Sequence, residues 1–144
     1  MDINKLIKEA ILNKNSLRLS ALRAIKSAFI LAQTEKGAKD LDDIARQKII
    51  LKQVKHRKDA SVIYLEQNRK DLSDYELAQV EVLEEFLPKQ LNETEVREVV
   101  KATIDESGAK SMADMGKVMQ IVSQKISGKA DGKLVADIVK SILQ

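Results

Sequence analysis

The chain has 144 residues, of which 44% are hydrophobic and only 3% aromatic, and it contains no cysteine and one histidine. These counts exclude disulfides, thiolate metal sites and imidazole clusters, so no metal or cofactor is expected. Basic side chains number 25 and acidic side chains 22, giving a formal charge of +3. A core limited to Leu, Ile, Val, Ala and Met favours helix packing, so the composition predicts an all-α protein.

Three helices are predicted in the first 70 residues. Residues 2–13 place apolar side chains on one side of a short helix. Ser16 can cap the second helix, whose apolar residues recur with i, i+3, i+4 and i+7 spacing until Gly37 ends it. Asp40 then opens a long helix that is predicted to reach about residue 68, roughly 40 Å at 1.5 Å per residue.

A fourth helix is predicted over about residues 72–86, where Ser73 followed three residues later by Glu76 forms a capping-box pattern. Pro88, the only proline, ends this helix because it lacks an amide hydrogen and restricts the residue before it. The segment 87–91 is therefore the best candidate for a domain boundary.

Three shorter helices are predicted beyond the proline, and each has a plausible cap at its start. They cover about residues 92–106, 111–126 and 131–143. Together with the boundary, this pattern predicts an N-terminal helical domain with a long helix over 1–87, a linker over 88–91 and a small three-helix module over 92–144.

Charge is distributed unevenly along the chain. Residues 44–70 carry eight basic and two acidic side chains, whereas residues 71–106 carry three basic and eleven acidic ones. Either the acidic helices neutralise the basic helix inside the fold, or they lie on a separate face.

The basic run at residues 55–58 interrupts an apolar stripe that contains Ile50, Leu51 and Val54 and resumes at Val62 and Leu65. The run either contacts phosphates or pairs with Glu81, Glu84 and Glu85 of the next helix. Lys55, Arg57 and Lys58 are therefore candidate nucleic-acid contacts, weaker than the lysines of the C-terminal module described below.

His56 belongs to the same run, and histidine is a common general base. A general base needs a companion nucleophile, metal or oxyanion site, and the sequence contains no Ser-containing elbow of the G-x-S-x-G type. A surface role is the favoured interpretation, and no catalytic residue is predicted.

The strongest candidates for a nucleic-acid contact are lysines beside glycines at helix ends in the C-terminal module. Glycine allows close backbone approach, and the first turn of a helix offers unpaired N–H groups to an anion. The alternative is a capped turn, with Gly128 as a left-handed terminator and Asp131 as the next N-cap. Residues 128–133 (GKADGK) are incompatible with the phosphate loop of nucleotide-binding proteins, because the spacing between the two glycines is one residue too short and no strand precedes them. The candidates are Lys117, Lys125, Gly128, Lys129 and Lys133.

Several short motifs carry a family resemblance that covers essentially the whole chain. Residues 116–119 (GKVM) and 125–135 (KISGKADGKLV) resemble the tail module of the GatB component of the glutamine-dependent aspartyl/glutamyl-tRNA amidotransferase. Residues 55–59, 68–72 and 82–88 resemble the free-standing YqeY proteins, which share this module. The chain departs from the family at Gln79, where a glutamate is expected, and at Phe86, where tyrosine is usual.

The resemblance implies a tRNA-binding or tRNA-amidotransferase-associated protein without its own catalytic centre. It also implies tRNA as the main partner, and an amidotransferase or an aminoacyl-tRNA synthetase as a protein partner. Two alternatives remain open: an auxiliary subunit of a glutamine-dependent carbon–nitrogen ligase, and a protein-interaction module. No DNA specificity is expected.

The N-terminus lacks the basic region and apolar run of a signal peptide, and no apolar stretch approaches the roughly 20 residues of a membrane span. A cytoplasmic protein without membrane attachment is therefore expected.

Overall fold

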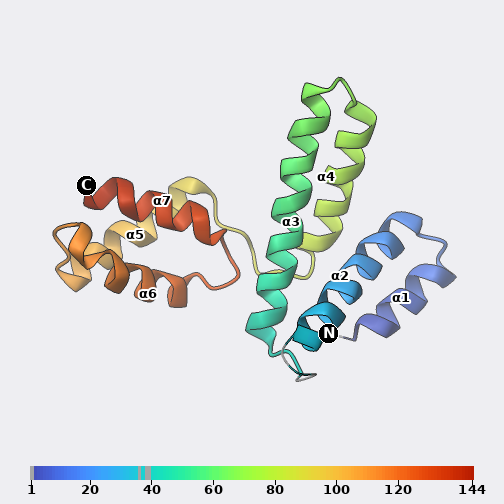
Figure 1. Ribbon diagram of the computed structural model, residues 1–144, viewed down its shortest axis with the longest axis horizontal. Coiled ribbons are helices and arrows are strands. Elements are labelled where there is room, and N and C mark those ends of the chain that lie inside the picture. Colours follow the sequence, from blue (N-terminus) through green and yellow to red (C-terminus); the bar gives the residue numbers. More distant parts are fainter. Residues whose placement is uncertain (1, 36, 38–39) are drawn as a thin grey trace. The chain divides into compact units, whose positions relative to one another are not determined.

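The computed structural model describes residues 2–35, 37 and 40–144 of the chain (Figure 1). The described residues form seven α-helices and one short 3₁₀ helix and contain no strand, which confirms the all-α prediction. The chain divides into two compact units, residues 1–87 and 88–144. The first unit holds α1 (Ile3–Leu12), α2 (Ser16–Glu35), α3 (Asp43–Glu66) and α4 (Lys70–Glu84); the second holds α5 (Glu93–Ser107), η1 (Met112–Asp114), α6 (Met115–Lys125) and α7 (Gly132–Leu143).

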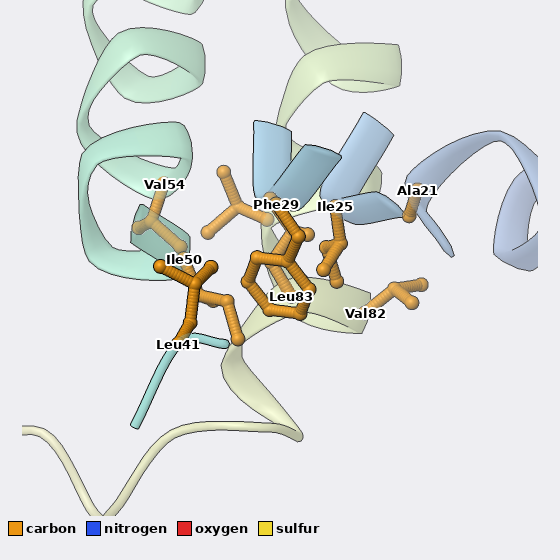
Figure 2. Packing of buried hydrophobic residues seen from close by; sticks show 9 residues of the cluster. Ala21, Ile25, Phe29, Leu41, Ile50, Val54, Val82 and Leu83 are labelled. Carbon is orange, nitrogen blue, oxygen red and sulfur yellow. The ribbon is translucent and has the colours of Figure 1, made fainter. Parts of the chain in front are cut away.

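The first unit is built on the antiparallel hairpin of α3 and α4; α2 packs against both, and α1 packs on α2 (Figure 1). Apolar residues three or four positions apart share one face of a helix, so the three longer helices bury these faces together. Figure 2 shows the ring of Phe29 lying among side chains from α2, α3 and α4. The buried cluster comprises Ala21, Ile25, Phe29, Leu41, Ile50, Val54, Val80, Val82 and Leu83.

Several predicted helix starts are shifted by one or two residues. Asn15, not Ser16, caps α2, since its side-chain oxygen accepts a hydrogen bond from the backbone N–H of Arg18 at 3.0 Å. Asp42, not Asp40, caps α3 by accepting from Ala45 N–H at 2.7 Å. Asp42 has the extended backbone, with a φ of −77° and a ψ of 172°, that an N-cap requires.

The capping-box prediction for α4 is wrong. The helix begins at Lys70, and Ser73 lies inside it, fully buried. The chain reaches this start through a tight turn in which Asn68 has a φ of 59°. The side chain of Glu76 is bound to Arg57 of α3, so it cannot reach back to a cap. The helix also ends at Glu84, before the predicted Phe86.

The apolar stripe of α3 does not mark its buried face beyond Val54. Ile50 and Val54 are buried, but the face toward α4 continues through Arg57 and Ser61. Val62 remains 55% exposed, and Leu65 is similarly exposed. The half of the α3–α4 hairpin next to its connecting turn, which we call the distal hairpin, therefore has a polar interior, whereas Val62 and Leu65 are exposed.

The polar interior is held by a few specific contacts. Arg57 Nη1 lies 3.2 Å from Glu76 Oε2, with each side chain 18% exposed. The buried Gln79, at the position where the family resemblance predicts glutamate, donates from Nε2 to Tyr75 Oη at 2.9 Å. Among the described residues, Arg57 Nε, Ser73 Oγ and Gln79 Oε1 are buried without a hydrogen-bond partner. Such a partly satisfied layer stabilises less than an apolar one.

The second unit is a three-helix module in which α5, α6 and α7 each pack against the other two. Helix α5 begins with a capping box, in which the side chains of Asn92 and Glu95 each accept a hydrogen bond from the backbone N–H of the other residue. The predicted start of α5 is therefore confirmed. Gly108, with a φ of 70°, ends that helix. The core is almost entirely aliphatic and contains Val96, Val100, Val118, Val122, Ile126, Val135, Ile138, Val139 and Leu143.

Candidate nucleic-acid interface

The turn between α6 and α7 has the capped geometry that the sequence allows. Gly128 has a φ of 74° and is buried. The N–H of Lys129 donates to the carbonyl of Ile126 at 2.9 Å. Asp131 caps α7, its carboxylate accepting from Lys133 N–H at 3.4 Å. Gly128 therefore serves the turn itself, and its burial leaves its backbone poorly placed for direct contact with a phosphate.

A long-range contact ties this turn to the segment that follows Pro88. Gln90 Nε2 donates to the carbonyl of Gly128 at 2.7 Å. The N–H of Leu91 donates to the carbonyl of Lys129 at 2.8 Å. Residues 88–91 belong to the second unit, and the two hydrogen bonds join this segment to the turn.

This contact brings the residue after Lys89 to the turn that carries Lys129 and leads into Lys133. We call Lys89, Lys129 and Lys133 together the basic turn. Lys89 is exposed and directly precedes Gln90, which is bound to the turn. Lys129 is half-buried, whereas Lys133 is exposed in the first turn of α7. Sequence reasoning missed Lys89, because no local pattern links it to residues about 40 positions later.

The structure does not bring Lys117 to the same helix end as the basic turn. Lys117 is exposed in the first turn of α6, whereas the turn follows the last residue of that helix. The separation along the helix axis is about 13 Å at 1.5 Å per residue. Lys117 therefore lies apart from the basic turn, on the same unit.

Lys125 is already engaged within the module. Its Nζ lies 3.0 Å from Glu106 Oε2 and 3.2 Å from Thr103 Oγ1, which joins α6 to α5. A phosphate contact through Lys125 would compete with both interactions. These interactions rank Lys125 below the other candidate lysines of the module.

The weaker candidates on α3 face acidic partners on α4. Arg57 pairs with Glu76, and Lys58 Nζ lies 3.5 Å from Glu84 Oε1. Glu85 pairs instead with Arg18 of α2. These pairs show that the acidic helix neutralises part of the basic helix within the fold, which was one of the two predicted arrangements.

The same pairs engage Arg57 and Lys58 within the first unit. Lys55 is half-buried on the same helix, and His56 is exposed. Within the described part of the chain, no group of three or more Asp, Glu or His side chains is arranged to hold a metal ion. No helix of that part is long and apolar enough to cross a bilayer.

Comparison with known proteins gives a match over nearly the whole chain. The family described as "Yqey-like protein" matches residues 1–143. A protein of Pyrenophora tritici-repentis named "Altered inheritance of mitochondria protein 41, mitochondrial" is 31% identical over 144 positions, covering 95% of this chain and 76% of the relative. A protein of the same name from Lachancea thermotolerans is 29% identical over 86 residues, which span 60% of this chain and 46% of that relative, less than half of its length.

Proposed function

The chain belongs to the YqeY-like protein family, and we propose that its second unit binds transfer RNA along the sugar-phosphate backbone. The contact surface is the basic turn, Lys89, Lys129 and Lys133, with Lys117 as an additional contact. In this role the chain presents tRNA without supplying a catalytic centre. The sequence resemblance to the tail module of a tRNA-dependent amidotransferase supports tRNA as the nucleic acid.

The observation that carries the proposal is the pair of hydrogen bonds from Gln90 and Leu91 to the carbonyls of Gly128 and Lys129. They hold two segments distant in sequence in one place and fix the backbone that carries three lysines. A pre-ordered surface loses less conformational freedom on binding than a flexible one. Lysine side chains recognise phosphates as point charges and carry little base specificity.

Asp131 lies at the same helix start and offsets part of the positive charge. Its carboxylate accepts from Lys133 N–H, so it is engaged in capping α7. The expected affinity is accordingly moderate and strongly dependent on salt, because counterion release supplies most of the binding free energy.

The test is a fluorescence-anisotropy titration of bulk tRNA at several salt concentrations, with the full chain and a Lys89→Glu, Lys129→Glu, Lys133→Glu variant. We expect weaker binding at low salt and a shallower dependence of log K on log salt, by about one unit for each phosphate contact removed. Lys117→Glu alone should have a smaller effect of the same kind. Substitution of the exposed Lys89 and Lys133 should alter stability by less than about 0.5 kcal/mol. Melting temperatures of the variants identify any folding effect of the change at the half-buried Lys129.

Lys101→Glu is the matched control, because Lys101 is an exposed lysine on α5 of the same unit. It changes the net charge of the unit without touching the basic turn. An equal loss of tRNA affinity in Lys101→Glu and in Lys129→Glu would show that only the net charge of the unit matters, and it would contradict the proposal. Unchanged affinity in the triple variant would also contradict it.

A finer form of the proposal places the chain beside a tRNA-dependent amidotransferase as an accessory protein. The support is the resemblance of residues 116–119 and 125–135 to the GatB tail module. The isolated chain is then expected neither to hydrolyse glutamine nor to consume ATP. Glutaminase turnover that follows the protein through purification and is lost in His56→Ala would contradict this form while leaving tRNA binding untouched.

A further inference from the structure

The α3–α4 hairpin has one face that no other helix of the first unit covers. On α3, positions spaced by three, four or seven residues define it: Ile44, Leu51, Lys55, Lys58, Val62 and Leu65. On α4 the corresponding set is Lys70, Asp74, Leu77, Glu81 and Glu84. We call this surface the outer hairpin face.

The two sets lie on the same side of the hairpin. Lys58 of α3 reaches Glu84 of α4 at 3.5 Å, which joins them directly. The opposite side of α4 is the one that packs on α2. There Tyr75 Oη donates to Ser20 Oγ at 3.3 Å, and the guanidinium of Arg18 lies 5.5 Å from the ring centre of Phe86.

The outer hairpin face is apolar enough to be an interaction surface. Val62 and Leu65 of α3 are 55% and 52% exposed, and Leu77 of α4 is 42% exposed. Ile44 is similarly exposed at the other end of α3. Clustered exposed aliphatic side chains on a helical surface are typical of protein contacts, whereas isolated ones need no explanation.

The charges on this face are divided between the two helices. The α3 half carries Lys55 and Lys58. The α4 half carries Asp74, Glu81 and Glu84 and one lysine, Lys70, which lies 3.8 Å from Asp74, so its net charge is negative. The surface is therefore basic and aliphatic on one side of its midline and acidic and aliphatic on the other. A surface of this kind is complementary to its own copy, which is the requirement of an isologous two-fold interface.

We propose that the outer hairpin face binds a second copy of this chain, with the two-fold axis running along the hairpin. Rotation about that axis places α3 of one copy over α4 of the other, so the basic half of each face lies over the acidic half of its partner in a four-helix arrangement. An axis across the hairpin would instead place α3 on α3 and α4 on α4, where like charges oppose each other. The exposed aliphatic side chains of the two copies are then removed from water together.

RNA fits this face less well than a second copy does. Half of the surface is acidic and would repel phosphates, and the exposed apolar residues Val62, Leu65 and Leu77 offer no aromatic ring on which a base could stack. A membrane-surface helix keeps its lysines at the edges of one apolar band, where they extend to the headgroups. On α3 the lysines lie between the apolar residues along the axis.

The proposal is tested by sedimentation equilibrium of the full chain over a concentration series. Val62→Glu puts a carboxylate opposite the acidic half of the partner and should raise the dimer dissociation constant by at least about tenfold, equivalent to about 1.4 kcal/mol. Ile63→Glu is the matched control: Ile63 is the next residue of α3, is 51% exposed, and lies outside the outer hairpin face. It should leave the dissociation constant unchanged.

A charge exchange gives a second, independent readout. Lys55→Glu and Glu81→Lys should each weaken self-association, and a one-to-one mixture should form a heterodimer because the altered charges again oppose each other. A wild-type chain that stays monomeric throughout, or equal effects of Val62→Glu and Ile63→Glu, would overturn the proposal. Loss of tRNA binding in Val62→Glu but not in Ile63→Glu, with unchanged mass, would assign the face to RNA and overturn it as well.

Discussion

The two units of this chain are both built from α-helices, but the side chains that they bury differ in polarity. In the second unit, the apolar side chains of α5, α6 and α7 form a continuous aliphatic core. In the first unit, the proximal hairpin is apolar, but its distal half encloses Arg57, Ser61, Ser73 and Gln79. Helical periodicity alone therefore says where a face lies, and the neighbouring helix decides whether that face is buried.

The difference has an energetic meaning. Burial of aliphatic surface stabilises the fold by about 25 cal/mol for each Å² removed from water, and it does not depend on a directed contact with a particular partner atom. A buried polar layer contributes only when its donors and acceptors are satisfied. The second unit should therefore be uniformly stable, whereas the distal hairpin should open at lower free energy than the rest of the first unit.

The largest expected effect comes from truncating an aliphatic core residue. Ile138→Ala should lower the unfolding free energy of the second unit by about 2–5 kcal/mol, since Ile138 is almost fully buried. Hydrogen exchange read by mass spectrometry would show the loss of protection in residues 88–144. Leu83→Ala, in the core of the first unit, is the counterpart for residues 1–87. An equal loss in both units from either substitution would show that they do not unfold separately.

A smaller effect is expected from breaking the ion pair inside the distal hairpin. Glu76→Ala should destabilise the first unit by about 1–3 kcal/mol, because Arg57 then keeps its charge in a poorly hydrated place. The double variant Arg57→Met, Glu76→Leu should recover most of this loss, since apolar side chains of similar size often replace a buried pair without cost. Urea unfolding monitored by circular dichroism measures both. A double variant with a lower free energy of unfolding than Glu76→Ala would show that the polar interior is required for stability.

Two glycines of the second unit should respond in opposite directions. Gly108 has a φ of 70° and open space around it, so alanine there should cost about 1–2 kcal/mol from backbone strain alone. Gly116 lies in α6 with similar open space, and alanine there should stabilise by about 0.5–1 kcal/mol because helical glycine is entropically unfavourable. Thermal melting of the two variants gives the comparison. The same sign for both would contradict the assigned backbone roles.

The smallest effect concerns the start of α4. Hydrogen bonds from the Arg69 guanidinium hold the pKa of the Asp71 carboxyl below its ordinary value. A carboxyl with a lowered pKa in the folded state adds stability above its unfolded pKa, and this stability is lost as the pH falls through the folded pKa. Carbon NMR of Asp71 should therefore show a titration midpoint below the ordinary range. In Arg69→Gln the midpoint should return toward that range, and an unchanged midpoint would contradict the assigned cause.

Local sequence signals determined much of the fold. The scarcity of aromatic residues and the helical spacing predicted the all-α class. Asn92, Gly108, Gly128 and Asp131 occupy the caps and terminators that their chemistry favours. These features depend on residues within one helical turn, so a single sequence is sufficient to read them. The same reasoning erred at Ser73, because an inter-helix pair with Arg57 competed for Glu76.

Only the tertiary structure decided which residues meet across long separations. The polar face of α3 follows from what α4 presents to it, and the basic turn includes Lys89 because Gln90 and Leu91 bind carbonyls about 40 residues further along. No periodicity or cap encodes such a contact, since it depends on how complete helices pack. The sequence by itself therefore determined the helices and indicated several candidate lysines. The packing of those helices determined which charged side chains are paired and which remain at the surface.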